Sequence, residues 1–428
     1  MNKPTLNDAA WEKLFDKYDI LKRIENDGFF NISASQIREF REPRLMTKFD
    51  HVVNLPELFA GNRLSILPVT RGDYIISSFD AYHKFETADM PVHSMSLPDY
   101  VQSLNSDNIS SETIALNCAA ASGIIENFTE DENIFATVSG RMGSGEFSFN
   151  IRDVKNNEYR KIDVKNSQIE IDAAYEGVSS LVLFEAKKEI SEDFLVRQLY
   201  YPFRVWKKHV NKPVKTVFLV YSNGVFRLFE YCFEQPDSYN SLRLVKQKNY
   251  SVEDTTISVT DIQSILKTST IVEEPEIPFP QADKFERIIN LCELLNTQKL
   301  SRSEVTEKYA FDARQTNYYT DAARYLGLLE RQKENGNALY SISRLGGNIL
   351  KMNFKQRQLA YCKAVLSHKV FNDMLNIYFK RGAMPSVKET VRIMKESRLC
   401  GIESDSTYKR RSSSVKSWIN WIVSLINV

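Results

Sequence analysis

Two segments, SQIEIDAAYE at residues 167–176 and LVLFEAKKE at residues 181–189, decide how this chain is interpreted. In both, apolar residues recur at every second position, which is typical of a β-strand with one face in a core. Between them lies GVSS at residues 177–180, a short run with the glycine and serines that turns favour. The two segments therefore predict neighbouring strands of one sheet joined by a hairpin.

The charged residues of these strands fall in a particular phase. In the first strand, Asp172 shares a face with Glu170 because strand side chains alternate. In the second strand, Glu185 and Lys187 share the face opposite Phe184. Two carboxylates and an ammonium are therefore expected to converge at one edge of the sheet.

This combination suits the hydrolysis of a phosphodiester. Mg²⁺ prefers oxygen ligands, commonly one or two carboxylates with water and a phosphate oxygen. Asp172 and Glu185 are the expected ligands, joined by the carbonyl of Ala186. Lys187 would lie beside the attacking water, where its charge offsets the charge that develops during reaction.

The pattern resembles the PD-(D/E)XK nuclease superfamily. The residues that carry the resemblance are Ile171-Asp172 on one strand and Glu185-Ala186-Lys187 on the next. The proline that often precedes the aspartate in that superfamily is absent here, as it is in many members. The resemblance covers roughly residues 110–232 and implies an α/β restriction-endonuclease-like core, a mixed sheet flanked by helices.

Two further positions match the superfamily less specifically. Many members carry a glutamine or arginine on the helix after the core strands, which Gln198 or Arg197 would supply. Many also carry a glutamate on a preceding helix, which Glu112 would match in a helix expected at residues 110–128. Glu112 could equally be a favourable charge in the first turn of that helix.

Within the superfamily, the run EIDAAYE, FEAKKE and FLVRQLYYPFRVW looks most like type II restriction endonucleases. That resemblance implies Mg²⁺-dependent cleavage of double-stranded DNA at a short specific sequence, in a prokaryotic cytoplasm. It also implies a companion DNA methyltransferase that protects the host. A palindromic target would be matched by a two-fold homodimer.

Bulk composition is consistent with a folded, reduced protein. The 428 residues are 43% hydrophobic and 26% charged, and their length predicts two to four domains. The sequence contains no apolar run of about 18 residues that would predict a membrane span. Five scattered cysteines without a CxxC pair favour free thiols over a zinc site.

Charge is distributed unevenly along the chain. Residues 350–428 carry 15 Lys and Arg against 5 Asp and Glu, a net charge of +10, whereas residues 1–282 carry 31 against 41, a net charge of −10. A basic C-terminal part beside an acidic body suggests contact with a polyanion. A solvated helical surface is the alternative.

The expected domains follow from these patterns. Residues 1–105 are expected to form an N-terminal α/β region, which faces DNA, a partner subunit or solvent, and residues 106–270 are expected to form the nuclease core. The segment IVEEPEIPFPQ at 271–281 predicts a linker. Residues 282–350 predict three helices and a β-hairpin, a winged helix. Residues 351–428 predict a basic helical domain, for which a second helix-turn-helix is one arrangement.

Candidate DNA contacts lie in both C-terminal parts. The third helix of the expected winged helix, DARQTNYYTDAARYLGLL at residues 312–329, is the expected recognition helix. The side chains placed to reach base edges or phosphates are Arg314, Gln315, Asn317 and Tyr318. The cluster Lys409, Arg410 and Arg411 is placed to contact phosphates or is an ordinary solvated face. Two alternatives to a restriction endonuclease remain open, a structure-specific repair, resolvase or nicking nuclease and a catalytically inactive winged-helix regulator.

Overall fold

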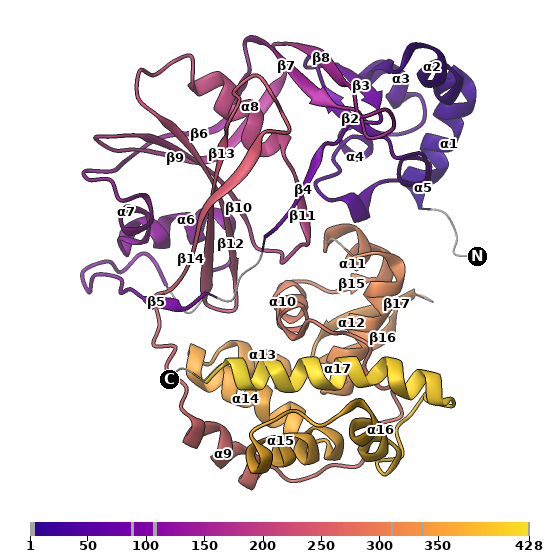
Figure 1. The fold of residues 1–428 in the computed structure, drawn as a ribbon, viewed down its shortest axis with the longest axis vertical. Coiled ribbons are helices and arrows are strands. Elements are labelled where there is room, and N and C mark those ends of the chain that lie inside the picture. Colours follow the sequence, from indigo (N-terminus) through magenta and orange to yellow (C-terminus); the bar gives the residue numbers. More distant parts are fainter. Residues whose placement is uncertain (1–4, 87–89, 106–108, 310, 335–336, 427–428) are drawn as a thin grey trace.

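The computed structural model describes residues 5–86, 90–105, 109–309, 311–334 and 337–426. It is a mixed α/β protein with an N-terminal part, a central mixed sheet flanked by helices and a helical C-terminal body (Figure 1). No helix in the described ranges combines the length and the apolar character that crossing a membrane requires.

The N-terminal part packs short helices around a small antiparallel sheet ordered β1-β3-β2. The first helical segment is divided into α1 and α2, because Asp19 adopts a left-handed conformation with φ 49° and ends the first helix. Trp11, with no exposed surface, anchors the core of this part and donates its indole N–H to the Met46 carbonyl at 3.0 Å. The elements are α1 (Leu6–Tyr18), α2 (Ile20–Asp27), β1 (Phe30–Ser33), α3 (Ala34–Arg38), α4 (Pro43–Met46), η1 (Val52–Asn54), α5 (Glu57–Asn62), β2 (Ser65–Pro68) and β3 (Asp73–Ser77).

The central sheet has the strand order β5-β14-β13-β12-β10-β9-β6. Its pairs are antiparallel except β10 with β12 and β14 with β5, which are parallel. The parallel pair β10–β12 is connected by the crossover helix α8, which covers one face of the sheet. The strands are β5 (Val92–Ser94), β6 (Phe135–Gly143), β9 (Gln168–Glu176), β10 (Leu181–Lys187), β12 (Val214–Ser222), β13 (Val225–Phe233) and β14 (Leu242–Ser251).

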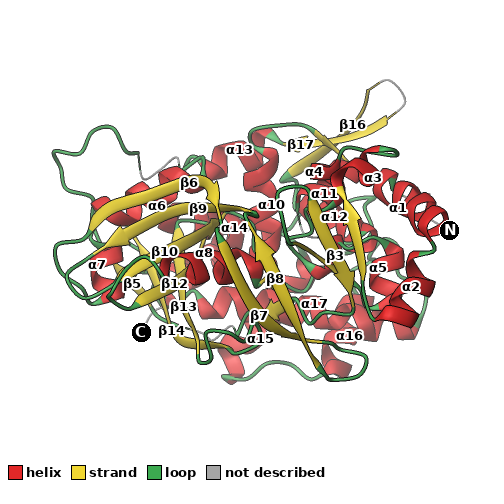
Figure 2. Cartoon of the chain, turned by 90° about the horizontal axis from the view of Figure 1, so that it is seen from above, coloured by secondary structure: helices red, strands yellow, loops and turns green. Residues whose placement is uncertain are grey.

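Helices bury both faces of this sheet. On one face, α6 (Glu112–Ala121) and α7 (Ile124–Thr129) pack against side chains of β10 such as Phe184 and Ala186. On the other face, α8 (Arg197–Trp206) packs with a separate hairpin, β7 (Glu146–Arg152) and β8 (Tyr159–Lys165). This hairpin stands between the central sheet and the N-terminal sheet (Figure 2). The central strands that sequence predicted are therefore covered on both sides.

The expected boundary between residues 105 and 106 is wrong. Residues 106–108 lie outside the described residues, but β5, upstream of them, pairs in register with β14 and so belongs to the central sheet. Similarly, β4 (Tyr82–Lys84) pairs with β11 (Asp193–Leu195), directly before α8. Strands of three residues carry too little periodicity for sequence analysis to detect them.

The C-terminal body begins with the three helices and the hairpin that sequence predicted. Its strands form a sheet ordered β15-β17-β16. The elements are α10 (Phe285–Leu295), β15 (Leu300–Ser301), α11 (Arg302–Lys308), α12 (Ala313–Tyr325), β16 (Leu329–Glu334) and β17 (Asn337–Ile342). They are followed by α13 (Arg344–Leu350), α14 (Phe354–Leu366), α15 (Lys369–Arg381), α16 (Val387–Lys395) and α17 (Asp405–Ser424).

The segment 271–281 is packed at its C-terminal end, whereas Ile271 and Val272 at its start are exposed. The fully buried Phe279 stacks on Phe371 of α15 with ring centroids 5.9 Å apart. A single hydrophobic core joins α9 (Val259–Thr268), the expected winged helix and the C-terminal helices, and Phe285 of α10 stacks on Trp421 of α17 at 3.9 Å. Residues 282–350 and 351–428, expected as two domains, contribute side chains to this one hydrophobic core.

Candidate active site

The candidate site lies where β9 and β10 separate. Their antiparallel pairing runs from Leu181 opposite Glu176 to Phe184 opposite Ala173. Beyond that point β10 stays paired with β12 through Lys187. In place of a strand neighbour, the Ala186 N–H donates to the Asp172 carboxylate at 2.8 Å. The separation of β9 from β10 thus leaves room for the Asp172 side chain beside the end of β10.

A β-bulge aims Asp172 into this place. Val138 and Gly140 of β6 are two residues apart, but their partners in β9, Ala174 and Ile171, are three apart. The extra residue in β9 interrupts the alternation and turns the local strand. Asp172 and Glu170, expected on one face, differ in burial: Asp172 is partly buried, whereas Glu170 is exposed and pairs with Arg141 at 3.1 Å. Glu170 also lines a small cavity beside Glu185 and Gln198.

Glu185 is the centre of the buried polar network. Its side chain is 10% exposed, and one of its oxygens, Oε1, accepts from Lys187 Nζ at 2.5 Å and from Gln198 Nε2 at 2.6 Å. Burial raises the pKa of Glu185 to about 7, since a carboxylate loses hydration there, while the charge of Lys187 opposes this shift. The structure therefore brings Gln198 of α8 to Glu185, as the resemblance implied.

Lys187 is surrounded by carboxylates. Its ammonium also donates to the Ala186 carbonyl at 3.3 Å. Burial acts to lower the pKa of Lys187, but the surrounding negative charges, chiefly Glu185 and Glu112, raise it above its ordinary value. The side chain is therefore held as a cation, which suits a role as a hydrogen-bond donor and positive charge.

Glu112 and Asp50 complete the acidic surroundings. Glu112, the first residue of α6, is half-buried, and its pKa is raised by burial and by Glu189 and Asp172, against the attraction of Lys187. Asp50 was not among the candidates. Its side chain is 17% exposed, its charge acts on both Glu185 and Lys187, and its backbone carbonyl accepts from the Leu195 N–H at 2.9 Å. The N-terminal part therefore adds negative charge to the surroundings of Glu185 and Lys187.

Arg197 takes a different position. Its guanidinium lies over the Tyr201 ring at 5.8 Å, and its charge acts on the buried hydroxyls of Tyr82 and Tyr239. Of the two candidates on this helix, Gln198 is the one hydrogen-bonded to Glu185. Arg197 supports the aromatic core under α8.

The oxygen set at this site fits a Mg²⁺ ion. Within the described residues, no cluster of three or more His, Cys, Asp or Glu side chains is arranged to hold a metal. Mg²⁺ needs fewer protein ligands, because it retains water. Two carboxylates, Asp172 and Glu185, and the Ala186 carbonyl lie together. In addition, the buried Oε1 of Gln198 has no hydrogen-bond partner within the described part of the chain, and a cavity of about 10 Å³ lies beside Gln198 and Glu185. That cavity is close to the size that one water molecule occupies.

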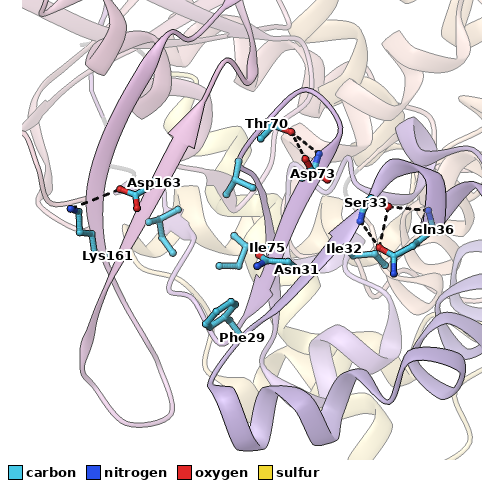
Figure 3. Close-up of a pocket in the computed structure, with 12 residues that line it drawn as sticks. Phe29, Asn31, Ile32, Ser33, Gln36, Thr70, Asp73, Ile75, Lys161 and Asp163 are labelled. Atoms are coloured by element: carbon cyan, nitrogen blue, oxygen red, sulfur yellow. Dashed lines mark hydrogen bonds and ion pairs between the residues drawn. The ribbon is translucent and has the colours of Figure 1, made fainter.

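A larger cavity lies away from these residues. It has a volume of about 510 Å³ and lies between the N-terminal sheet and β8 (Figure 3). Its polar side chains bond locally, as in the Thr70 hydroxyl donating to Asp73 at 2.8 Å. Size alone therefore does not locate the chemistry of this chain.

The expected recognition helix, α12, presents its candidates unequally. Arg314 is exposed, and Asn317 and Tyr318 are partly exposed. Gln315 is engaged in the helix cap, because its side-chain oxygen accepts from the Asp312 N–H at 3.1 Å. Its expected base contact would compete with that cap.

The basic cluster of α17 lies beside α12. Lys409 and Arg410 are exposed. Arg411 is partly buried, and its charge interacts with Tyr318 and Asp321 of α12. Burial lowers the pKa of Arg411, and Arg410 lowers it further. Two of the three cations in the cluster are therefore open to solvent, on a surface shared with α12.

Comparisons with known proteins divide the chain in a similar way. Three families described as domains of unknown function match it, DUF6996 at residues 8–76, DUF6997 at residues 77–251 and DUF7226 at residues 287–427. No curated protein and no solved structure matches the chain. The second match begins upstream of β4 and β5, as the observed pairing of these strands requires. The candidate trio falls within that match, whereas Asp50 falls within the first.

Proposed function

We propose that the chain is a Mg²⁺-dependent endonuclease that cuts double-stranded DNA at a short specific sequence, in the manner of a type II restriction endonuclease. The observation that carries this proposal is the convergence of Asp172, Glu185 and Lys187 at the end of β10. A buried carboxylate and ammonium are costly to desolvate, so a purely structural pair here would be an expensive choice. The resemblance to PD-(D/E)XK nucleases is the second support.

Each residue has a distinct task in this proposal. Asp172, Glu185 and the Ala186 carbonyl would hold the cation, which when bound polarises the scissile phosphate and neutralises charge on the leaving oxygen. Lys187 now donates to Glu185 Oε1 and to the Ala186 carbonyl, two of those oxygens. With phosphate in the site, the ammonium would release these oxygens and donate to a phosphate oxygen. Gln198 orients Glu185.

DNA binding is assigned to the C-terminal body, which we interpret as a winged helix built into a larger helical unit. The exposed Arg314 of α12 can reach base edges, and the exposed Lys409 and Arg410 of α17 can neutralise phosphates. Cutting both strands requires two sites, so we expect a two-fold homodimer on DNA and a companion methyltransferase that protects the same sequence.

Plasmid DNA incubated with the protein and Mg²⁺, followed by sequencing of the ends, tests the proposal. Ends at one repeated short word support it. Random nicks, or ends confined to junctions, would instead identify a nicking or structure-specific nuclease. Retained DNA binding without any cleavage would overturn the enzyme and leave a winged-helix regulator.

A further inference from the structure

The chain directly after Lys187 is held by the C-terminal body. Asn290 of α10 receives the Ile190 N–H on Oδ1 at 2.9 Å and donates from Nδ2 to the Lys188 carbonyl at 2.8 Å. One carboxamide thus bonds the backbone on both sides of Glu189. Asn290 is 4% exposed, so both bonds are shielded from water. The end of β10 is therefore fixed from outside its own sheet.

Asn290 is itself fixed by two neighbours. The Tyr309 hydroxyl donates to its Oδ1 at 2.6 Å, and its Nδ2 also donates to Glu293 at 3.0 Å. Glu293 in turn accepts from the Ser222 hydroxyl at 2.6 Å, at the end of β12. Because β12 is the partner of β10, α10 is hydrogen-bonded at the ends of both strands, through Asn290 after β10 and through Glu293 at the end of β12.

A packed route leads from Asn290 to the expected recognition helix. Arg287, one turn earlier on α10, is 2% exposed. Its guanidinium lies 4.3 Å from the Phe311 ring and 5.3 Å from the ring of Tyr319, which belongs to α12. It also lies 3.9 Å from Glu192, in the loop that follows β10. A shift of α12 is therefore expected to displace the loop through Arg287, because close-packed interiors transmit displacement.

We infer that Asn290 is a positioning residue, through which DNA held by α12 and α17 sets the position of Lys187. The inference rests on the proposed function and adds its regulation. DNA binding at the C-terminal body would stabilise the arrangement of α10 in which residues 188–190 are pinned, and with them the ammonium. Cleavage is then linked to correct DNA contact, because the two occur on parts joined by one side chain.

The test compares Asn290→Ala with Gln358→Ala in the full chain. Gln358 is a matched control, since it is fully buried on α14 and donates to Asn223 at 2.8 Å across the same contact between the body and the sheet. It does not bond residues 188–190. Tyr309→Phe is a milder second variant, which removes only the hydroxyl that fixes Asn290.

Hydrogen exchange of the amides of residues 186–190 is the first measurement, with and without a DNA duplex in Ca²⁺. In Asn290→Ala, exchange there should rise at least ~10-fold while β13 amides stay unchanged, since a shielded hydrogen bond is lost. Duplex should slow this exchange in the unmutated protein and in Gln358→Ala, but not in Asn290→Ala. Tyr309→Phe should lie between.

Kinetics supply the second measurement. Asn290→Ala should lower the single-turnover rate of plasmid cleavage in Mg²⁺ by ~10- to 100-fold, with DNA affinity changed less than ~3-fold, because misplacing a reacting group costs rate rather than binding. Equal exchange in Asn290→Ala and Gln358→Ala, or loss of affinity in parallel with rate, would overturn the inference. An unmutated protein that leaves plasmid uncut would overturn the proposed nuclease instead, and the exchange data would still decide whether Asn290 positions this loop.

Discussion

Around Glu185, charged groups are buried and paired, whereas on α12 and α17 they are spread over an exposed surface. Glu185 and Lys187 have side chains only 10% and 16% exposed, and each is the partner of the other. Arg314, Lys409 and Arg410 are open to solvent. Removing one member of a buried pair leaves an uncompensated charge, while removing one exposed cation changes little but the long-range attraction. Mutations in the two regions should therefore differ in size and in salt dependence.

The largest effect is expected from the trio itself. Lys187→Ala and Asp172→Ala should each lower Mg²⁺-dependent cleavage by at least ~10²-fold, because in the proposed nuclease each removes a group that would act on the scissile phosphate. DNA binding measured in Ca²⁺ should be nearly intact in both. Glu176→Ala is the control on the same strand, since Glu176 lies at the far end of β9 and pairs with Lys212 at 2.9 Å. Equal losses in all three variants would show that the strand, and not the chemistry, is sensitive.

Gln198 should give an intermediate effect. It orients Glu185 through a bond of 2.6 Å without being a ligand of the trio. Gln198→Ala should weaken the apparent affinity for Mg²⁺ by ~10- to 100-fold, in the range found for groups that orient metal ligands. A titration of cleavage rate against Mg²⁺ concentration measures this. A lower maximal rate at an unchanged Mg²⁺ midpoint would place Gln198 on the substrate rather than on the cation site.

The two regions also differed in how far sequence could define them. Asp172, Glu185 and Lys187 could be identified because strand alternation is a local pattern. The apolar residues of each strand indicate which face is buried, and so which face carries the charged residues. The bulge between Ile171 and Ala174, in which Asp172 lies, was not predictable, because it depends on the partner strand β6. Asp50 was missed because its electrostatic effect on Lys187 comes from the tertiary fold, between residues far apart in sequence and without a periodic signal.

The C-terminal body shows the same limit on a larger scale. Its three helices and hairpin were predicted from periodicity and turn residues, yet residues 271–281 were interpreted as a linker from their prolines and glutamates. Phe279 in that segment is fully buried. Composition indicates that a segment lacks regular structure, but not whether it is packed. Asn290, a polar residue in an amphipathic helix, likewise carried no sequence signal for its contact with Lys188 and Ile190.

On the exposed surface, Arg314 should affect sequence discrimination. Arg314→Ala should cost about 1–3 kcal/mol on the cognate duplex and little on other DNA, as expected for the loss of a base contact. Gln315→Ala should instead lower thermal stability, because Gln315 caps α12 by accepting from Asp312. Gel-shift affinities on cognate and unrelated duplexes, with thermal unfolding beside them, separate the two roles. A uniform loss of affinity from Arg314→Ala would reassign it to a phosphate.

The smallest and most salt-dependent effect is expected from α17. Replacing Lys409 and Arg410 together by alanine should reduce the slope of log K against log salt concentration by roughly 2, because each phosphate contact contributes about 0.9. The loss should be nearly equal for specific and non-specific duplexes, since phosphate contacts carry no sequence information directly. Arg411 should contribute less to the slope, because it is partly buried beside Tyr318 and Asp321.

A charge-matched control decides whether this surface, rather than net charge, is responsible. Lys267 of α9 and Lys363 of α14 are exposed, so replacing both by alanine removes the same charge from other helices of this body. If DNA follows α12 and α17, that control should leave the slope unchanged, because charges more than about 10 Å from phosphate are largely screened near 0.1 M salt. Equal slope changes in the two double variants would mean that the whole basic body attracts DNA without a defined path. In that case the assignment of Arg314 to base contacts would also be withdrawn. Sequence recognition would then be assigned to residues nearer to Glu185.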